Sequence, residues 1–331
     1  MTAPIWQLKT VSLASGSTTR LGGVTLSIQP GVTAVLGASG AGKSSLLSLL
    51  AGFEQPTSGA IEFVPKADAG QLPLFWSPQD NGLWPKLTAR EHLATVRPDA
   101  PQIDRSVDEW LALLRLSEVA DALPHRLSQG ERSRLSLGRA LASEADCLVL
   151  DEPLAHVDPI HCRSYLDLIA NHAKSIEGHV VFSTHDPASV LRIAEHVICL
   201  SEARCVFSGP GNELYFNPPT EETAWLLGPA NWIDEGNVSL RSLFGDTTLR
   251  CVRPGELSVF RDETETVSNN GPAVGEVIDK QSDGDIVELT IQDATGRIHQ
   301  LFSGRCDADI VAGTRIRLRF HPRVERPTTS R

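Results

Sequence analysis

The sequence predicts an α/β domain followed by a small all-β domain. As far as about residue 235, short apolar runs typical of buried parallel strands alternate with segments patterned as helices. Beyond that point the helix signals stop, and short strand-like runs recur between turns rich in Gly, Asn and Asp. A chain of 331 residues is long enough for two domains with separate cores. We therefore expect domains at residues 1–235 and 236–331.

The first domain is expected to start with strands. Residues 1–30 alternate apolar and polar side chains, which predicts antiparallel pairing. Residues 31–37 form a short apolar run expected to be a buried strand, and residues 43–51 predict a helix that ends at Gly52. A stretch rich in Pro and Gly follows, from Gln55 to Pro73.

Residues 88–144 predict an inserted helical subdomain. Thr88 and Glu91 have the spacing of a capping box at a helix start. Helix-spaced apolar positions recur over residues 108–116 and 131–143. We therefore expect several helices between two strands of the core.

Two further apolar runs belong to the α/β core, and a series of short runs makes up the second domain. Residues 147–150 and 180–183 are almost continuously apolar, as in strands covered on both faces. The strands expected in the second domain are residues 248–253, 257–261, 275–278, 286–291, 298–302 and 314–320.

Charge and cysteine content restrict the possible partners. The formal net charge of −11 argues against binding to nucleic acid, for which a basic face is expected. None of the six cysteines forms a Cys-x-x-Cys pair, which predicts buried, reduced thiols. The N-terminus lacks the pattern of a signal peptide, and no run approaches the ~20 apolar residues that span a bilayer. Any action at a membrane would therefore depend on a partner.

The strongest chemical signal is a glycine-rich loop between a predicted strand and a predicted helix. Its sequence fits the Gly-x-x-x-x-Gly-Lys-Ser/Thr pattern of a phosphate-binding loop, in which backbone N–H groups and the positive end of the helix face phosphate oxygens. We expect Lys43 to contact the β- and γ-phosphates of ATP and Ser44 to ligate Mg²⁺. The residues expected to contact the nucleotide are Gly37, Ala38, Ser39, Gly40, Ala41, Gly42, Lys43, Ser44 and Ser45.

The second signal is an acidic pair at the end of the predicted strand 147–150. Parallel strands deliver the residues that follow them to one edge of the sheet, so Asp151 and Glu152 are expected beside the phosphate-binding loop. Asp151 can hold Mg²⁺ directly or through water. Glu152 can act as the general base that polarises an attacking water molecule. Loop and acidic pair together predict a P-loop ATPase.

Four further motifs indicate which kind of P-loop ATPase. The four are Leu127-Ser128-Gln129-Gly130-Glu131, Gln79, Ala155-His156-Val157-Asp158 and His185. In their order and spacing, together with the two motifs above, they resemble the ATPases of ABC transporters, in which they would be the signature motif, the Q-loop glutamine, the D-loop and the switch histidine. The resemblance covers residues 1 to about 235.

The resemblance implies roles for these residues in a homodimer that closes head to tail on two ATP molecules. Ser128 and Gly130 would contact the γ-phosphate held by the other protomer, and Asp158 would lie near the nucleotide. Gln79 would contribute to catalysis and to the Mg²⁺ site, and His185 would stabilise the developing charge. The hydrolytic set is complete, which favours an active enzyme.

The resemblance also implies partners. Residues 236–331 are similar to the OB-like TOBE domain of certain importers, with the best local match at Val252–Leu257. We therefore expect an importer ATPase at the cytoplasmic face of the inner or plasma membrane, bound to permease subunits and served indirectly by a solute-binding protein. The segment Asn81–Thr88 resembles the site that receives the permease. The short link Leu227–Ile233 resembles that of ferric iron, molybdate or polyamine importers more than that of sugar importers, and of these we expect iron(III) or another inorganic ion as the solute.

Three departures from the family pattern stand out. The aromatic residue that usually stacks on adenine is replaced by Ser15, for which Trp6 is a conceivable substitute. The signature has Gln129 and Glu131 in place of Gly and Gln. The D-loop carries His156 and Val157 where small and aliphatic residues are usual.

Two alternatives belong to other functional classes. A soluble ABC ATPase acting on DNA or ribosomes would be expected to have paired ATPase domains, a coiled-coil insertion or basic patches. A nucleotide-binding regulator without turnover would not need Glu152 and His185.

Overall fold

The chain forms two compact units, residues 1–214 and 215–331, which are described separately. The predicted boundary between residues 235 and 236 lies outside the described residues, so it stays a prediction. No helix in the described part of the chain is long and apolar enough to cross a membrane. The structure, a computed structural model, describes residues 3–65, 71–99, 101–103, 105–233, 251–262, 273–293 and 296–321.

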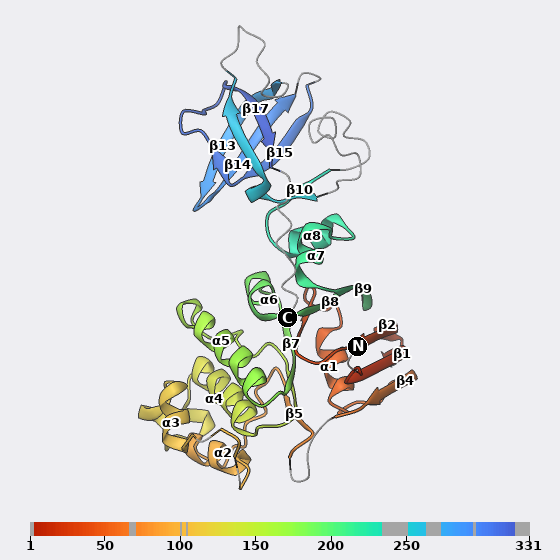
Figure 1. The fold of residues 1–331 in the computed structure, drawn as a ribbon, viewed down its shortest axis with the longest axis vertical. Coiled ribbons are helices and arrows are strands. Elements are labelled where there is room, and N and C mark those ends of the chain that lie inside the picture. The colour runs from red at the N-terminus through yellow and green to blue at the C-terminus, as the bar shows by residue number, and fades with distance from the viewer. Residues whose placement is uncertain are drawn as a thin grey trace. The chain divides into compact units, whose positions relative to one another are not determined.

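The first unit is built around a mixed six-stranded sheet in the order β5-β6-β7-β3-β8-β9 (Figure 1). Strands β5, β6, β7, β3 and β8 run parallel, and β9 pairs antiparallel with β8. Every residue of β3 and β6 is buried, which explains their continuously apolar sequences. The strands are β3 (Val32–Leu36), β5 (Leu74–Ser77), β6 (Cys147–Leu150), β7 (His179–Thr184), β8 (His196–Ser201) and β9 (Arg204–Gly209).

A smaller antiparallel sheet packs onto the same core. Its order is β2-β1-β4, with β1 Trp6–Ser15, β2 Thr18–Ile28 and β4 Ser58–Phe63. The pairing of β1 with β2 confirms the predicted antiparallel strands. Strand β4 lies within the stretch rich in Pro and Gly and was not predicted. Apolar side chains of this sheet, of helix α1 (Lys43–Leu50) and of the central sheet form one hydrophobic cluster.

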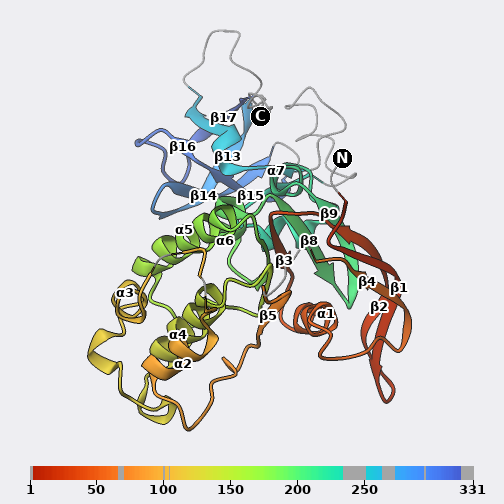
Figure 2. The same cartoon turned by 60° about the horizontal axis from the view of Figure 1, so that its bottom comes forward.

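The inserted helical subdomain lies on one side of the unit, and the antiparallel sheet lies on the other (Figures 1 and 2). Thr88 caps α2 together with Glu91 in the predicted capping box. The long helix α5 was not predicted. The helices of this unit after α1 are α2 (Ala89–Val96), α3 (Val107–Leu113), α4 (Gln129–Ala142), α5 (Pro159–Ser175) and α6 (Pro187–Ile193), and α7 (Gly211–Phe216) crosses the boundary between the units.

The second unit contains the predicted all-β domain. Its main sheet has six strands in the order β15-β14-β13-β17-β12-β16, and a two-stranded sheet joins β10 to β11. One apolar cluster lines the main sheet. The elements are α8 (Glu221–Leu226), β10 (Asn231–Trp232), β11 (Cys251–Val252), β12 (Leu257–Arg261), β13 (Ala273–Asp283), β14 (Ile286–Asp293), β15 (Ile298–Ser303), β16 (Arg305–Cys306) and β17 (Arg315–Phe320).

A buried arginine connects the beginning of the second unit to its β-sheet. Arg253 is 2% exposed, and its guanidinium donates to the carbonyl oxygens of Tyr215, Ala224, Gly228 and Pro229. The same group lies 4.2 Å from the centre of the Tyr215 ring. Because carbonyl oxygens satisfy the cation, burying it costs less than burying an unpaired charge would.

Candidate nucleotide-binding site

The predicted site residues follow neighbouring parallel strands of the central sheet. Gln79 follows β5, Asp151 and Glu152 follow β6, His185 follows β7, and the glycine-rich loop follows β3. These four strands are adjacent in the order β5-β6-β7-β3 and run in the same direction. Their carboxyl ends therefore meet at one edge, where open α/β sheets bind ligands.

The backbone of the glycine-rich loop is constrained by the strands around it. A Cβ atom built on Gly37 would lie 2.5 Å from the carbonyl oxygen of Leu200, and one on Gly42 would lie 2.8 Å from that of Arg20. Gly42 also has a φ of 102°, which favours glycine, and it immediately precedes helix α1. Residues 38–40 are exposed, so this part of the loop is accessible to a ligand.

Lys43 is folded back onto this loop. Its Nζ donates to the carbonyl oxygens of Gly37, at 2.9 Å, and Ala38, at 3.1 Å, and lies 3.8 Å from Oε1 of Glu152. The side chain is almost fully buried. Ser44, the next residue, is exposed at the start of α1. The loop therefore presents one buried cation and one accessible hydroxyl.

Ser183 on β7 fixes the acidic pair. Its hydroxyl donates to Oδ1 of Asp151 at 2.5 Å and accepts from the backbone N–H of Glu152 at 2.8 Å. Asp151 is buried, with 4% of its surface exposed. Glu152 has a positive backbone φ, of 47°. A positive φ is uncommon for glutamate, so the neighbouring structure holds this residue in place. Ser183 was not predicted as a site residue, because no sequence signal says which strand residue faces the acidic pair.

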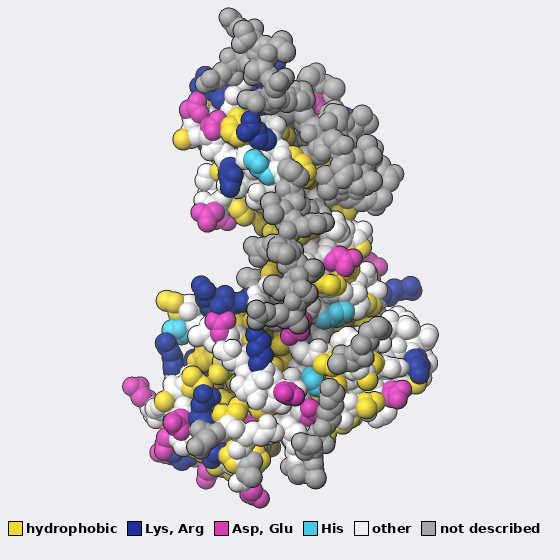
Figure 3. Space-filling view, viewed as in Figure 1, with side chains coloured by type: hydrophobic (Ala, Val, Ile, Leu, Met, Phe, Trp, Pro, Cys, Tyr) yellow, Lys and Arg dark blue, Asp and Glu magenta, His cyan; other side chains and the backbone are white. Residues whose placement is uncertain are grey.

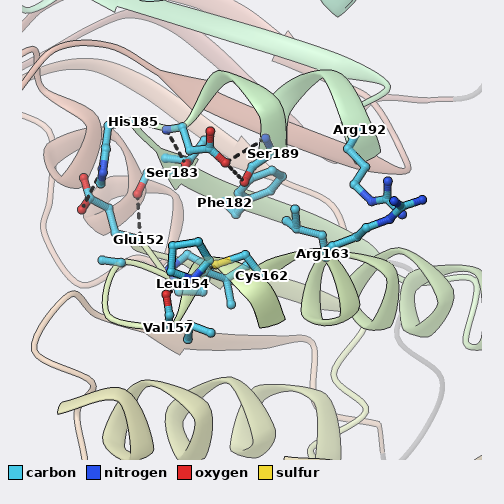
Figure 4. A pocket seen from close by; sticks show the side chains of 16 residues that line it. Glu152, Leu154, Val157, Cys162, Arg163, Phe182, Ser183, His185, Ser189 and Arg192 are labelled. Carbon is cyan, nitrogen blue, oxygen red and sulfur yellow. Dashed lines mark hydrogen bonds and ion pairs between the residues drawn. The ribbon is translucent and has the colours of Figure 1, made fainter. Parts of the chain in front are cut away.

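His185 lies next to Glu152. Its Nδ1 is 3.5 Å from Oε2 of Glu152, and most of its side chain is exposed. Figure 4 shows this pair at one end of a cavity of about 620 Å³, with Arg163 and Arg192 at the other end. The glycine-rich loop is not among the residues that line the cavity. The structure thus brings Lys43, Glu152 and His185 together, with Glu152 in the middle.

The other predicted residues lie on exposed segments. Gln79 is exposed beyond the end of β5. Ser128 caps helix α4, where its hydroxyl donates to Oε2 of Glu131 at 2.7 Å and accepts from the Glu131 N–H. This hydrogen bond lowers the pKa of the Glu131 carboxyl, so Glu131 is ionised at neutral pH. Gly130 lies in the first turn of α4, and Asp158 caps α5.

The two residues considered for adenine stacking are not equivalent. Ser15 is exposed at the β1–β2 hairpin, as expected for a position near a ligand. Trp6 is 0% exposed, stacks on Phe63 and donates to the carbonyl oxygen of Leu50, so it cannot present a face to adenine. The sequence analysis did not predict Arg20 beside the glycine-rich loop: its Nε donates to Ser45 Oγ at 3.2 Å, and Glu54 accepts from its guanidinium.

Fold and site define a P-loop nucleotide-binding protein. The family model described as "ABC transporter" matches residues 21–155. The chain is 31% identical over 275 residues to the sulfate/thiosulfate import ATP-binding protein of Pseudomonas syringae pv. tomato, covering 78% of this chain and 81% of that protein. It is 30% identical over 304 residues to an Fe(3+) ions import ATP-binding protein of Rhodococcus jostii, covering 86% and 87% of the two chains. A putrescine transport ATP-binding protein of Escherichia coli is 31% identical over 239 residues, which cover 69% of this chain and 63% of that protein.

Solved structures agree at the level of the fold. The ATP-binding subunit of an ABC transporter matches with a TM-score of 0.55 and 23% identity, covering 63% of this chain and 91% of that chain. A dimeric ATP-binding cassette bound to ADP and Pi matches with a TM-score of 0.53 and 24% identity, covering 62% and 98%. The chain belongs to the family of ABC transporter ATP-binding proteins, which are ATPases.

Proposed function

We propose that this protein is the ATP-hydrolysing subunit of an importer and that it drives solute uptake through a separate membrane permease. The observation that carries the proposal is the convergence of Lys43, Asp151, Glu152 and His185 at one edge of the parallel sheet. The named relatives are import or transport ATP-binding proteins, which supports the importer direction.

ATP would bind along the glycine-rich loop. The backbone N–H groups of the exposed residues 38–40 and of the start of α1 suit phosphate oxygens. Lys43 is already positioned inside the loop, and its two carbonyl acceptors would be exchanged for phosphate oxygens. A neutral serine and a buried carboxylate are oxygen ligands of the kind that Mg²⁺ prefers, so Ser44 and Asp151 fit the ion, with Gln79 as a further ligand. When bound, Mg²⁺ neutralises charge on the phosphates.

Glu152 would be the general base. It lies between Lys43 and His185, and Ser183 fixes its backbone. Its carboxylate can accept a proton from a water molecule that attacks the γ-phosphate, while His185 holds the carboxylate from the other side. Because His185 is mostly exposed, it can also reach the phosphate when the site closes.

The site would be completed by a second copy of the chain. Ser128, Gly130 and Asp158 are accessible on the first turns of α4 and α5. In a head-to-tail homodimer, the N–H groups at the start of α4 would face the γ-phosphate bound by the partner. ATP would then be shared between two surfaces, and hydrolysis would release them.

The segment Asn81–Thr88 is held by side chains of α2 and α4, which suits a docking site for the permease. Arg139 donates to the Gly82 carbonyl oxygen at 2.7 Å and lies 4.5 Å from the Trp84 ring centre. Burial lowers the pKa of Arg139 to about 10, so it stays charged at neutral pH. His92 accepts from the Trp84 N–H and stacks on the Trp84 ring. Trp84 is 39% exposed and offers an aromatic anchor.

Binding to permease subunits would place the protein at the cytoplasmic face of the membrane, where a solute-binding protein on the opposite side would deliver the solute. The relatives are named for putrescine, spermidine, sulfate, iron(III) and glucose. Similarity therefore assigns no single solute, and iron(III) or another inorganic ion stays a prediction.

In Figure 3, Lys and Arg side chains on the first unit are interspersed with Asp and Glu, as on a solvated face.

The test is ATPase activity of the purified protein against that of Glu152→Gln, with ATP-dependent dimerisation followed by light scattering. We expect Mg²⁺-dependent turnover that falls by at least about a hundredfold in the variant, which would accumulate as a dimer on ATP. Glu177→Gln, a change on the first unit outside the site, is the matched control and should retain turnover.

Other outcomes would favour the alternatives. Nucleotide binding without turnover, even with permease added, would indicate a regulator. Turnover by the wild-type protein, without ATP-dependent dimerisation of the Glu152→Gln variant, would contradict the head-to-tail homodimer. Normal ATPase activity that no permease stimulates would favour a soluble ABC ATPase outside transport.

A further inference from the structure

Two of the unusual residues in the signature motif and the D-loop contact each other. Gln129 is the first residue of α4, and His156 lies in the loop between β6 and α5. The Gln129 side-chain amide nitrogen lies 3.1 Å from Nε2 of His156. An amide nitrogen only donates, so the ring nitrogen accepts. The two residues depart from the family pattern at separate places in the sequence, yet their side chains form one hydrogen bond.

The backbones of the two segments also meet at this point. A Cβ atom built on Gly130 would lie 2.8 Å from the carbonyl oxygen of His156. The start of α4 therefore rests directly on the loop, and any side chain at position 130 would push the two apart. The loop is itself fixed on its other side, because Val157 is buried and Asp158 caps α5.

We propose that Gln129 and His156 are a positioning pair that joins the first turn of α4 to the loop 155–158. This inference rests on the proposed function, in which Ser128, Gly130 and Asp158 face the nucleotide of a second protomer. The pair makes these residues approach that nucleotide as one surface. Gln129 supplies the donor that glycine at the same position would lack, and His156 supplies the acceptor.

The bond acts mainly in the closed dimer. Gln129 and His156 are exposed in the single chain, where water competes for both groups. A partner protomer that covers the surface would remove that water, and the hydrogen bond would become stronger in the drier environment. Its loss should therefore weaken dimer closure and leave ATP binding by the single chain unchanged.

The experiment measures the dimerisation constant on ATP by light scattering in a Glu152→Gln background, together with nucleotide affinity. The variants are Gln129→Ala, His156→Ala and the double variant, each with intact thermal unfolding. We expect each single variant to weaken dimerisation about five- to a hundredfold, the range for one hydrogen bond lost in each of the two protomers, and the double variant to be no weaker than the worse single one. Affinity for ATP in the single chain should not change.

His161→Ala is the matched control. His161 lies on the first turns of α5, and its ring nitrogen is 2.7 Å from Arg115 rather than from α4. It should leave dimerisation unchanged. The positioning pair would be refuted if the two single-variant effects multiplied in the double variant, or if no variant had any effect. In either case, dimerisation of the background protein on ATP would still support the proposed function. Failure of the Glu152→Gln background itself to dimerise on ATP would instead refute the head-to-tail dimer.

Discussion

The two six-stranded sheets of this protein use charged residues differently. At the edge of the central sheet, Lys43, Glu152 and His185 lie near one another at 3.5–3.8 Å, with accessible positions around them. In the second unit, two arginines are largely enclosed: Arg253 donates to backbone carbonyls, and Arg317 pairs with Asp262 at 2.7 Å. The first arrangement leaves groups available to a ligand, and the second uses them to hold the fold. Burial of a charge therefore does not identify a functional site: Lys43 and Arg253 both donate to backbone carbonyl oxygens, but only Lys43 also lies beside a carboxylate with an exposed neighbour, His185.

Lys43→Met is the sharpest test of this difference. It should reduce ATPase activity about a thousandfold, or about 4 kcal/mol, because the cation that faces the phosphates is lost. Global stability should fall by only about 1–2 kcal/mol, because two loop carbonyl oxygens lose their donor while the apolar side chain still fills the buried site. Activity and urea unfolding measured on the same sample check both halves. A large loss of stability would mean that Lys43 is as structural as Arg253.

Arg253→Met is the counterpart in the second unit. It should lower the stability of that unit by about 3 kcal/mol, because several carbonyl oxygens lose their donor. Hydrogen exchange of the amides in β12 and β17 reports this loss, and ATPase activity at low temperature should persist. Unchanged protection of these amides would show that the hydrogen bonds of Arg253 add no stability.

His172 on α5 belongs to the first unit but resembles the enclosed groups of the second, because it is buried and lies outside the candidate site. Within the described part of the chain, neither ring nitrogen has a hydrogen-bond partner, and burial lowers the pKa to about 4. The unfolded chain, with a pKa of about 6.5, binds a proton that the folded chain resists, so stability falls as pH drops from about 6.5 towards 4. The expected loss is about 2 kcal/mol at pH 5.

His172→Leu should remove this part of the pH dependence. Urea unfolding at pH 7.5 and pH 5 compares the two proteins, and the variant should lose less stability on acidification. An equal loss in both would assign the acid sensitivity to other groups.

The smallest expected effect concerns three identical capping boxes. Thr88 with Glu91, Ser106 with Glu109, and Ser128 with Glu131 make the same hydrogen bonds, but only the third lies in the signature motif. Glu131→Gln should tighten ATP-dependent dimerisation about two- to fivefold, because it removes a negative charge where the partner's triphosphate arrives and glutamine still caps the helix. Glu91→Gln is the control and should change nothing. Weaker dimerisation of Glu131→Gln would mean that the carboxylate supports closure.

The sequence predicted the parts of the fold that carry strong local patterns. Strands β3 and β6, helix α1 and the cap of α2 could be located because apolar runs and capping residues are local signals. Strand β4 was missed because it is formed by pairing with β1, far away in the sequence, and none of its residues is buried. Helix α5 was missed because its apolar positions are interrupted by His, Cys and Arg side chains.

The candidate site shows the same limit. Motifs supplied the residues that follow each strand, and parallel pairing explains why these residues gather. The role of Ser183 and the contact between Gln129 and His156 depend on distances between separate segments, which spacing along one chain does not reveal. The burial of Trp6 likewise follows from the packing of two sheets and a helix.

The tight approach of Gly37 to β8 affects how variants of this loop should be interpreted. A side chain at position 37 would meet the Leu200 carbonyl oxygen before it met any ligand. A library of substitutions across residues 37–44 would therefore contain two kinds of inactive protein. Variants altered at Gly37 would misfold and would be found in the insoluble fraction. Variants altered at Lys43 would be recovered as folded, soluble protein without ATPase activity.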